Sequence, residues 1–375
     1  MTHYSDILNQ LQSTGNYREI PADGDFRGID FSTNDYMGLG NDRELQRQFF
    51  DNVDNRAIPM TSSASRLLAS RQHEHEALER LLSDLYGRST LLFNSGYHAN
   101  TGIISALADS GTYIVADKLV HASIIDGIVL SRAPFTRFRH NDYDHLERIL
   151  QRIADSHERI LVITESIFSM DGDAADIDRM TDIKRRFNNV ILYIDEAHAF
   201  GAAGHRGLGL SRDNANYNDV DIIVGTFGKA AASSGAFAAV NSTIKNFLIN
   251  RSRSFIFSTA LSPMTCAWTS FVIERLVTMD AERDRLAMLG KHFAEKLSAI
   301  SAKPVVESHI IPFIVGDASL TVDMSLQLRA LGYKVLPIRT PTVPAGTERL
   351  RFSLSASMDV SDIDRVVNAI KSIMK

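Results

Sequence analysis

Short β-type runs alternate with amphipathic helical patterns through the middle of this sequence, and this alternation limits the possible folds more than any other feature. Leu78, Leu81, Leu82 and Leu85 recur at helical spacing ahead of Gly87. The strand-like runs occupy residues 90–94, 113–116, 135–138, 160–164, 190–194 and 222–226. Strands that alternate with helices form a mainly parallel sheet with helices on both faces, so we expect an α/β fold.

The pattern changes after residue 261. Long helical stretches over 264–300 lead into short β-type runs at 311–315, 334–337 and 350–354. A last helix is expected near the carboxyl end, with a capping box formed by Ser361 and Asp364 at its start. We therefore expect a smaller α+β domain here. The predicted organisation is an amino-terminal segment (1–53), a large domain (54–261) and a small domain (262–375).

Charge and composition exclude several function classes. The 375 residues include 40 Lys and Arg against 45 Asp and Glu, without a dense basic block, so nucleic acid and anionic membranes are not expected partners. The single cysteine, Cys266, cannot form an internal disulfide, and the histidines show no zinc-type spacing, so no metal site is predicted. No apolar stretch reaches membrane-spanning length, and we expect a cytoplasmic protein.

Two motifs suggest activities that the rest of the chain does not support. Asp195-Glu196-Ala197-His198 is typical of a large helicase class, but such a site needs a phosphate loop, and Ala230 follows Gly228-Lys229 where Ser or Thr is required. His73-Glu74-His75-Glu76 contains residue types that bind metals, yet adjacent residues on a helix point in different directions and cannot converge on one ion. We interpret this second motif as a solvated helix face.

A lysine and a carboxylate at neighbouring strand ends indicate chemistry on an organic cofactor. Lys229 follows the run 222–226 among small residues, where a partly desolvated amine can form a Schiff base. Asp195 ends the apolar run 190–194, where an unpaired carboxylate is costly, and a protonated pyridine nitrogen is a suitable partner. His198 is placed to bond a phenolic oxygen of the same ring. Taken singly, such a lysine is more simply an exposed residue of a loop, and an aspartate at a strand end is as ordinary a helix cap or arginine partner as it is a cofactor ligand.

Two further segments fit the same cofactor. Ser95-Gly96-Tyr97 follows the run 90–94 and opens a helix, which suits a phosphate group, although a simple helix cap is the alternative. His121 can lie flat on an aromatic ring, although a lone histidine is often a packing residue. Together these residues describe a phosphate anchor, a ring contact, a ring-nitrogen partner and an imine lysine in chain order.

These segments and their order resemble the α-oxoamine synthases, a family of fold-type I pyridoxal 5'-phosphate (PLP) enzymes. The matching segments are Asn34-Asp35-Tyr36-Met37-Gly38-Leu39, Phe93-Asn94-Ser95-Gly96-Tyr97, His121-Ala122-Ser123, Glu165-Ser166-Ile167-Phe168-Ser169-Met170-Asp171-Gly172, Asp195-Glu196-Ala197-His198 and Thr226-Phe227-Gly228-Lys229. The resemblance implies a large domain with a seven-stranded, mainly parallel sheet, a smaller carboxy-terminal α+β domain, and a homodimer with shared active sites.

The resemblance also implies roles for individual residues. Lys229 would hold PLP as a Schiff base and then act as acid and base, Asp195 would pair with the ring nitrogen, and His198 with the ring oxygen. His121 and Ala197 would lie on the two faces of the ring. The phosphate would be held by Ser95, Gly96, Tyr97 and Thr226, with Ser258 and Thr259 of a second subunit, and Glu165 and Ser169 would line the cofactor site.

The expected substrates come from the same resemblance. Arg351 would bind the amino-acid carboxylate as a bidentate fork, assisted by Asn34. The segment 338–347, with Arg339 and Thr342 as expected substrate contacts, resembles the biotin-pathway members, which condense L-alanine with a pimeloyl thioester carried by CoA or an acyl carrier protein. The chain departs from the family pattern at Thr61-Ser62-Ser63-Ala64-Ser65-Arg66, where glycines are usual, and the added Cβ atoms are expected to narrow the acyl entrance.

Other substrates and a non-catalytic role stay open at this point. Relatives within the family join glycine with acetyl-CoA or succinyl-CoA, or serine with a long acyl thioester, and the fold cannot separate them. A catalytically silent partner subunit of the same fold is the alternative from another class, and Lys229 beside Asp195 argues against it.

Overall fold

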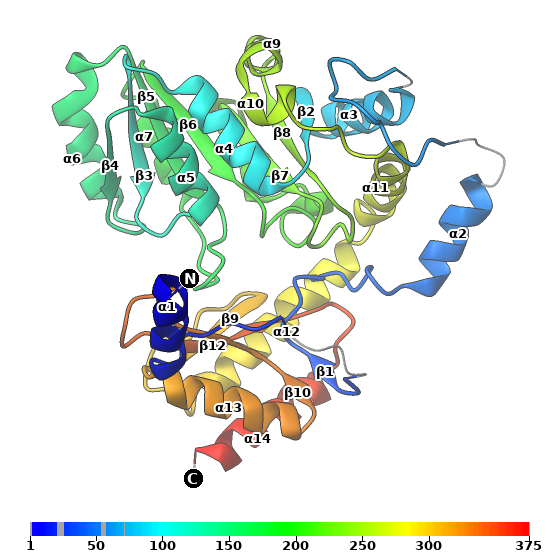
Figure 1. Ribbon diagram of the computed structural model, residues 1–375, viewed down its shortest axis with the longest axis vertical. Coiled ribbons are helices and arrows are strands. Elements are labelled where there is room, and N and C mark those ends of the chain that lie inside the picture. Colours follow the sequence, from blue (N-terminus) through cyan, green and yellow to red (C-terminus); the bar gives the residue numbers. More distant parts are fainter. Residues whose placement is uncertain (1, 21–25, 54–57, 71, 375) are drawn as a thin grey trace. The chain divides into compact units, whose positions relative to one another are not determined.

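A computed structural model describes residues 2–20, 26–53, 58–70 and 72–374 of the chain. Contacts divide it into two compact units, which we describe separately (Figure 1). The large unit comprises Met37–Phe168 and Ala174–Arg283. The small unit comprises Met1–Tyr36, Ser169–Asp173 and Asp284–Lys375.

A seven-stranded sheet forms the centre of the large unit, as predicted. Its order is β2-β8-β7-β6-β5-β3-β4. β8 runs antiparallel to β2 and β7, and the other neighbours are parallel. The strands are β2 (Ser89–Phe93), β3 (Thr112–Asp117), β4 (Phe135–Phe138), β5 (Arg159–Glu165), β6 (Val190–Asp195), β7 (Ile222–Thr226) and β8 (Ala236–Val240). Six of them match the expected runs to within one residue at each end. Its parallel strands therefore place their carboxyl ends at one edge, where β5, β6 and β7 carry Glu165, Asp195 and Thr226.

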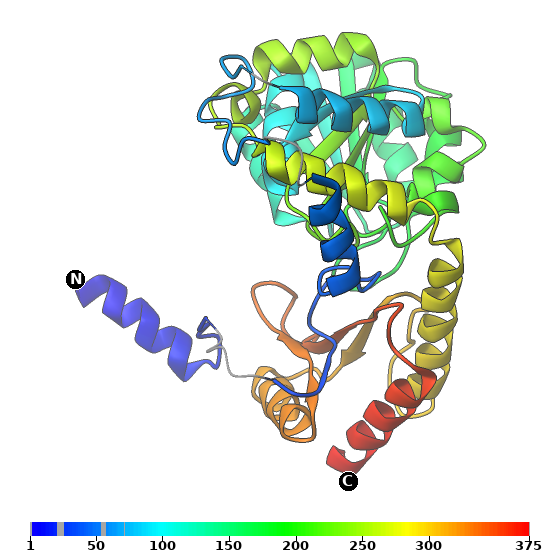
Figure 2. The same cartoon turned by 90° about the vertical axis from the view of Figure 1, so that its right-hand side faces the viewer.

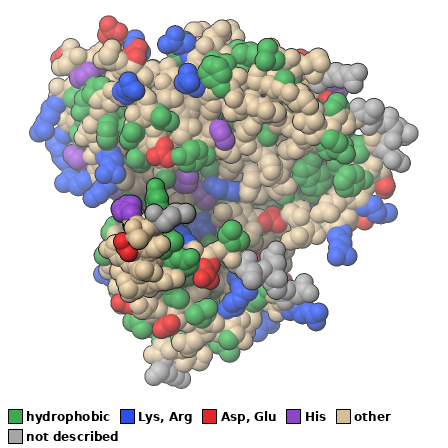
Figure 3. Space-filling model, viewed as in Figure 1, with side chains coloured by type: hydrophobic (Ala, Val, Ile, Leu, Met, Phe, Trp, Pro, Cys, Tyr) green, Lys and Arg blue, Asp and Glu red, His purple; other side chains and the backbone are tan. Residues whose placement is uncertain are grey.

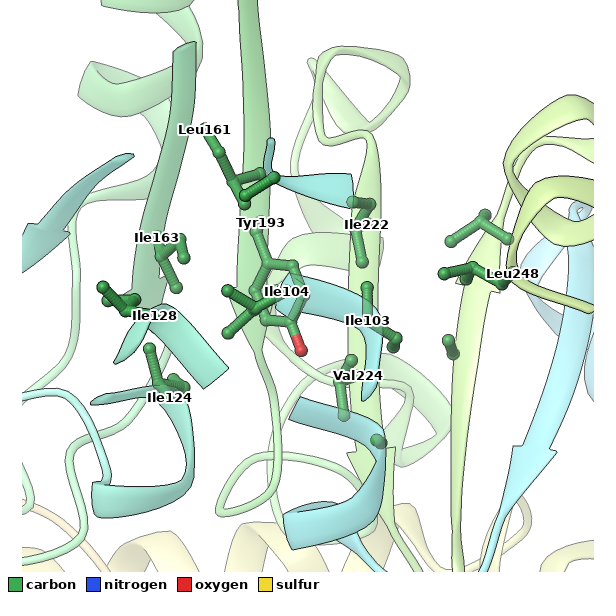
Figure 4. Packing of buried hydrophobic residues seen from close by; sticks show 14 of the residues in the cluster. Ile103, Ile104, Ile124, Ile128, Leu161, Ile163, Tyr193, Ile222, Val224 and Leu248 are labelled. Carbon is green, nitrogen blue, oxygen red and sulfur yellow. The ribbon is translucent and has the colours of Figure 1, made fainter. Parts of the chain in front are cut away.

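Buried apolar side chains join the sheet to its covering helices. Ile103 and Ile104 of α4 (Gly96–Leu107) and Ile124 of α5 (Ala122–Ser131) pack against Tyr193 and other strand residues (Figure 4). Burial of such side chains is the main stabilising contribution to this layer. The remaining α-helices of the unit are α2 (Arg43–Val53), α3 (His73–Tyr86), α6 (Tyr143–Ile153), α7 (Ile177–Lys184), α8 (Leu210–Asp213), α9 (Ser242–Arg251), α10 (Arg253–Ile256) and α11 (Pro263–Leu276).

The small unit is an α+β structure, as predicted. Its three-stranded antiparallel sheet has the order β11-β12-β9, and β1 pairs with β10 in a separate two-stranded sheet. The elements are α1 (Thr2–Ser13), β1 (Ile29–Asp30), β9 (Ile310–Ile314), α13 (Ala318–Ala330), β10 (Tyr333–Lys334), β11 (Leu336–Ile338), β12 (Arg349–Ser353) and α14 (Val360–Ile373). In Figure 2, α14 lies beside α12 (Asp280–Ser298), and His292 bonds Asp364 across the two helices at 2.9 Å.

The structure corrects two local predictions and divides the chain at a different place from the predicted domain boundary. The capping box of α14 is formed by Asp359 and Asp362, not by Ser361 and Asp364, because the helix begins at Val360. His75 is not on a solvated face: it is 1% exposed, and its Nε2 atom bonds the carbonyl oxygen of Leu261 at 2.8 Å. The large unit also extends to Arg283, beyond the predicted boundary at 261, because α11 packs against α3.

The surface carries both signs of charge. On the face in Figure 3, basic and acidic side chains are found over both units, in keeping with 40 Lys and Arg against 45 Asp and Glu. Within the described ranges, every helix is too short or too polar to cross a membrane.

Candidate functional site

A cavity of about 180 Å³ lies in the large unit at the carboxyl ends of β5, β6 and β7. The amino termini of α4 and α5 also border it, because both helices begin directly after this edge of the sheet. Its lining residues are Gly96, Tyr97, Asn100, His121, Ser123, Glu165, Asp195, Ala197, His198, Thr226 and Lys229. The structure therefore brings together nine of the predicted cofactor residues and adds Asn100 and Ser123.

Lys229 and His198 meet in this cavity. The Nζ atom of Lys229 lies 2.8 Å from Nε2 of His198. Lys229 lies in a tight turn after β7. Two hydrogen bonds close this turn: the Ala232 N–H donates to the Lys229 carbonyl and the Ser233 N–H donates to the Phe227 carbonyl, each at 2.9 Å. The amine and the imidazole thus occupy one side of the cavity, as required if both contact one aromatic cofactor.

Asp195 and Glu165 are buried side by side, since they are paired in the register of β5 and β6. Oδ1 of Asp195 accepts the Ala197 N–H at 2.8 Å, and Oε1 of Glu165 accepts the His121 N–H at 2.5 Å. Burial, and then the negative charge of Asp195, raise the pKa of Glu165 well above its usual value. Glu165 is thereby shifted toward the neutral acid, and Asp195 is the carboxylate suited to face a cation.

The amino end of α4 provides the donors suited to a phosphate. Ser95 caps this helix through its Oγ atom, which accepts the His98 N–H at 3.2 Å. Gly96 and Tyr97 form the first turn at the cavity wall, where helix N–H groups and the helix dipole favour an anion. The hydroxyl of Thr226 lies in the same wall and donates to the Gly235 carbonyl at 3.1 Å.

The donor set of the cavity fits PLP. An amine is present for the aldehyde, a buried carboxylate for the ring nitrogen, an imidazole for the ring oxygen, and a helix amino terminus for the phosphate. Partial desolvation lowers the pKa of His121, which favours the neutral ring suited to stacking. Among the described residues, no group of three or more His, Cys, Asp or Glu side chains is arranged to hold a metal ion.

A second cluster, in the small unit, surrounds Arg351. This side chain is 3% exposed and is held by hydrogen bonds from Nε to the Ser169 carbonyl (2.6 Å) and from Nη1 to the Ser353 hydroxyl (2.6 Å). Both Nη1 and Nη2 donate to Oδ1 of Asn34 at 3.2 Å. The amide oxygen of Asn34 therefore occupies the fork of the guanidinium, where a carboxylate oxygen would bind.

Two arginines, Arg18 and Arg339, form a further cluster in the small unit, together with Thr342. Arg339 and Thr342 are predicted substrate contacts. Arg18 donates to the Thr342 hydroxyl at 3.1 Å, and Arg339 donates to the Gly15 carbonyl. Desolvation and the like charge of Arg18 lower the pKa of Arg339. Neither guanidinium has an ion-pair partner among the residues that the structure describes. Two cations held together in this way favour an anionic ligand.

Comparison with known proteins decides the family. The family model described as aminotransferase class I and II matches residues 27–370. The chain belongs to this family. It is 46% identical over 382 residues to a Pasteurella multocida protein provisionally named 8-amino-7-oxononanoate synthase, covering 99% of both chains. A Haemophilus influenzae protein with the same provisional name is 41% identical and covers 97% of this chain and 98% of its own.

Solved structures of this family have the same fold. A Sphingomonas wittichii serine palmitoyltransferase is 30% identical with a TM-score of 0.86, covering 92% of this chain and 87% of its own. A Francisella tularensis 8-amino-7-oxononanoate synthase is 27% identical with a TM-score of 0.77, covering 93% and 98%. A S. paucimobilis serine palmitoyltransferase variant with a bound PLP–myriocin aldimine is 27% identical with a TM-score of 0.89, covering 99% and 96%. These likenesses confirm the predicted fold and family.

The remaining predicted site residues of this aminotransferase-family chain lie outside the cavity lining. Ser169 is in the small unit and contributes its carbonyl to Arg351. Ser258 and Thr259 follow α10, where the Thr259 carbonyl accepts a bond from Asn94 at 2.7 Å. Their expected part in a second subunit's site stays a prediction.

Three site residues were not predicted from the sequence. Asn100 stands four residues after Gly96, so helical spacing alone would place it on the same face of α4. Ser123 belongs to His121-Ala122-Ser123, one of the segments that resemble the family, but the resemblance predicts no role for it. Arg18 lies in a polar amino-terminal stretch with no pattern that marks it.

The departure at residues 61–66 is visible in the backbone. Ser63 has a φ of +53°, in the left-handed region that favours glycine. The serine therefore occupies a conformation that suits the glycine of the family pattern.

Proposed function

We propose that this chain is an α-oxoamine synthase that condenses L-alanine with a pimeloyl thioester to give 8-amino-7-oxononanoate in biotin biosynthesis. Its enzyme class, a PLP-dependent enzyme of the acyltransferase type, and its PLP cofactor are confirmed by the family match and by the PLP-bound structural neighbours. The choice of substrates is the proposal. It is supported by the names of the full-length relatives and by the arginine pair of the small unit.

Lys229 is the proposed amine for the cofactor aldehyde and, once released, the base and acid at the substrate Cα. When bound, PLP supplies an aromatic ring that accepts the negative charge developing at that carbon. His198, 2.8 Å from the Lys229 amine, is the proposed partner of the ring oxygen. Asp195, whose Oδ1 atom is held by the Ala197 N–H, is the proposed partner of the ring nitrogen.

Arg351 is the proposed receptor for the alanine carboxylate. Its fork is occupied by the Asn34 oxygen, so a substrate carboxylate has to replace that oxygen or share the fork with it. Two parallel charged hydrogen bonds would fix the direction of the Cα–H bond, and positioning of this kind can lower a barrier by about 7–11 kcal/mol.

The arginine pair carries the choice of acyl group. A pimeloyl chain ends in a free carboxylate, whereas acetyl and palmitoyl chains end in a methyl group. Arg18, which bonds the Thr342 hydroxyl, and Arg339, which bonds the Gly15 carbonyl, provide a cationic site for that carboxylate. The structural likeness to serine palmitoyltransferases favours serine and a long acyl thioester as a second candidate, but an uncharged tail gives this pair no partner.

A matrix of substrates tests the proposal. L-Alanine, glycine and L-serine are each combined with pimeloyl-, acetyl-, succinyl- and palmitoyl-CoA, and free thiol release is measured with mass spectrometry of the product. A pimeloyl-acyl carrier protein arm separates the two carriers. We expect the highest kcat/KM for L-alanine with a pimeloyl thioester; a higher value for serine with palmitoyl-CoA would replace this function with the second candidate.

We also propose a cytoplasmic homodimer in which Ser258 and Thr259 serve the partner's phosphate site. The single buried cysteine suits a reducing compartment. Light scattering tests the dimer, and mixing Lys229→Ala with Thr259→Ala subunits tests the shared site. Recovery of a fraction of activity in the mixture supports sharing, and two inactive parents without recovery contradict it.

A further inference from the structure

The two residues that the sequence did not predict in the cavity, Asn100 and Ser123, form one buried hydrogen-bond network with Asp195. Asn100 is 2% exposed and Ser123 is fully buried. Nδ2 of Asn100 donates to Oδ2 of Asp195 at 2.7 Å and to the Ser123 hydroxyl at 2.9 Å. Oδ1 of Asn100 accepts the hydroxyl hydrogen of Tyr193, whose ring lies among the buried core side chains (Figure 4).

The direction of each bond follows from the carboxylate. An ionised carboxylate only accepts hydrogen bonds, so the NH₂ group of Asn100 must face Asp195 and its oxygen must face Tyr193. Burial raises the pKa of Tyr193 well above its usual value, so this hydroxyl keeps the proton that it donates to Asn100. Both hydrogens of the amide are then used, one by Asp195 and one by Ser123.

The network continues to the ring of His121. The Ser123 oxygen accepts from Asn100, and the Ser123 hydroxyl lies 2.8 Å from Nδ1 of His121, so its single hydrogen can be donated to this nitrogen. The Ser123 N–H also donates to this Nδ1 atom, at 3.2 Å. Nδ1 is therefore an acceptor, and the neutral imidazole carries its proton on Nε2.

We infer that Asn100 is a positioning residue that couples the ring-nitrogen partner to the ring-stacking histidine. It orients the Asp195 carboxylate directly and, by orienting the Ser123 hydroxyl, adds to the Ser123 N–H in favouring the Nε2–H tautomer of His121. This inference rests on the PLP cofactor and is independent of which amino acid and acyl thioester react.

A cofactor analogue separates positioning from a general structural role. Asn100→Leu keeps a similar volume but removes the donor, and affinity is measured for PLP and for deaza-PLP, in which carbon replaces the ring nitrogen. We expect PLP binding to weaken roughly tenfold to a hundredfold, in the range for one lost buried hydrogen bond to a charged group, and deaza-PLP binding to change less than about twofold. An equal loss for both ligands, or no loss for either, would overturn the inference.

The tautomer is measured without any cofactor. In apoprotein labelled with ¹⁵N-histidine, the ring nitrogen shifts of His121 should indicate Nε2–H in the wild type. The share of Nδ1–H should rise in Ser123→Ala, where the Ser123 N–H is the donor left to Nδ1, and rise less in Asn100→Leu, where the Ser123 hydroxyl is no longer oriented by the amide. Thr101→Val, the next position of α4, removes a hydroxyl bonded only to backbone carbonyls and should leave both readouts unchanged. An unchanged tautomer in Ser123→Ala would contradict the relay.

Two outcomes keep the test decisive. If Asn100→Leu does not fold, Tyr193→Phe removes only the hydroxyl that fixes the amide, and it should show the same selective loss for PLP, with a smaller magnitude. A wild-type protein that binds no PLP would refute the cofactor assignment instead, while the tautomer measurement would still decide the network.

Discussion

The cavity of the large unit and the arginine clusters of the small unit are built in different ways. The cavity draws its polar groups from consecutive strand ends and helix starts, and most of them follow a strand within a few residues. The Arg351 cluster joins Asn34, Ser169 and β12, which are far apart in the sequence. The pair of Arg18 and Arg339 likewise joins two distant segments, because Arg18 bonds Thr342 and Arg339 bonds Gly15. The topology of a parallel sheet thus determines the proposed cofactor site, whereas long-range packing determines the proposed substrate contacts.

The largest effect is expected at the lysine of the cavity. Lys229→Ala should remove the visible absorbance of the cofactor–lysine imine. It should also lower turnover by a factor of about 10² to 10⁴ or more, because the residue that acts as acid and base at Cα is lost. Absorbance spectra and thiol release measure this, and Lys371→Ala on α14 is the matched control. Full turnover in Lys229→Ala with unchanged absorbance would refute the role of the lysine.

A second prediction concerns the carboxylate fork of the small unit. Arg351→Lys should raise the KM for L-alanine roughly tenfold to a hundredfold, since one ammonium cannot replace two parallel charged hydrogen bonds. Arg349→Lys on the same strand is the control, because Arg349 bonds Asp171 within the small unit. If both variants have the same KM for alanine, Arg351 is not the receptor.

A third prediction tests the acyl end. Arg18→Gln should raise the KM for a pimeloyl thioester about tenfold, the scale of one charged hydrogen bond, and should leave the KM for a heptanoyl thioester, which lacks the far carboxylate, nearly unchanged. Steady-state kinetics with the two thioesters give this difference directly. Equal increases in KM for both thioesters would show that Arg18 does not bind the far carboxylate of the acyl chain.

A fourth prediction uses the buried acid pair of the cavity. The folded-state pKa of Glu165 is raised, so the folded state holds a proton that the unfolded state releases above its ordinary pKa of 4.5. Apoprotein stability should therefore fall as pH rises above 4.5, until the raised pKa is passed, by at most about 1.4 kcal/mol per pH unit from this group. Urea unfolding at several pH values should show a flatter profile for Glu165→Gln. A slope equal to that of the wild type would contradict the raised pKa.

The smallest effect is expected where the chain departs from the family pattern. Ser63→Gly should stabilise the protein by less than about 1 kcal/mol, because relief of the positive φ is partly offset by the greater freedom of glycine in the unfolded chain. Ser62→Gly is the matched control and should destabilise, since the Ser62 hydroxyl bonds the Leu261 carbonyl at 2.7 Å. Thermal unfolding distinguishes the two, and stabilisation by both would show that φ is not the cause.

The comparison also explains which parts of the fold could be predicted. The parallel strands were predictable because apolar runs alternate with helical periodicity, but β8, with the sequence Ala-Phe-Ala-Ala-Val, is buried on both faces and shows no alternation. The box Ser361/Asp364 was wrong because any acidic residue three positions after a short polar residue fits that pattern, and the local sequence offers Asp359 and Asp362 as well.

The candidate site likewise contains residues that the sequence predicts and residues that it does not. Lys229, Asp195 and His198 were predictable from their places after strands. Asn100 was missed because a buried amide within an apolar helix has no local signature until the carboxylate it bonds is known. Arg18 was missed because its partner Thr342 is more than three hundred residues away in the chain.

Borohydride reduction followed by peptide mapping tests the central claim most directly. Reduction makes a cofactor–lysine bond permanent, so mass spectrometry reports which lysine holds PLP. We expect one stoichiometric adduct, on the peptide that contains Lys229. An adduct on a different lysine, or unmodified protein after incubation with excess PLP, would contradict it.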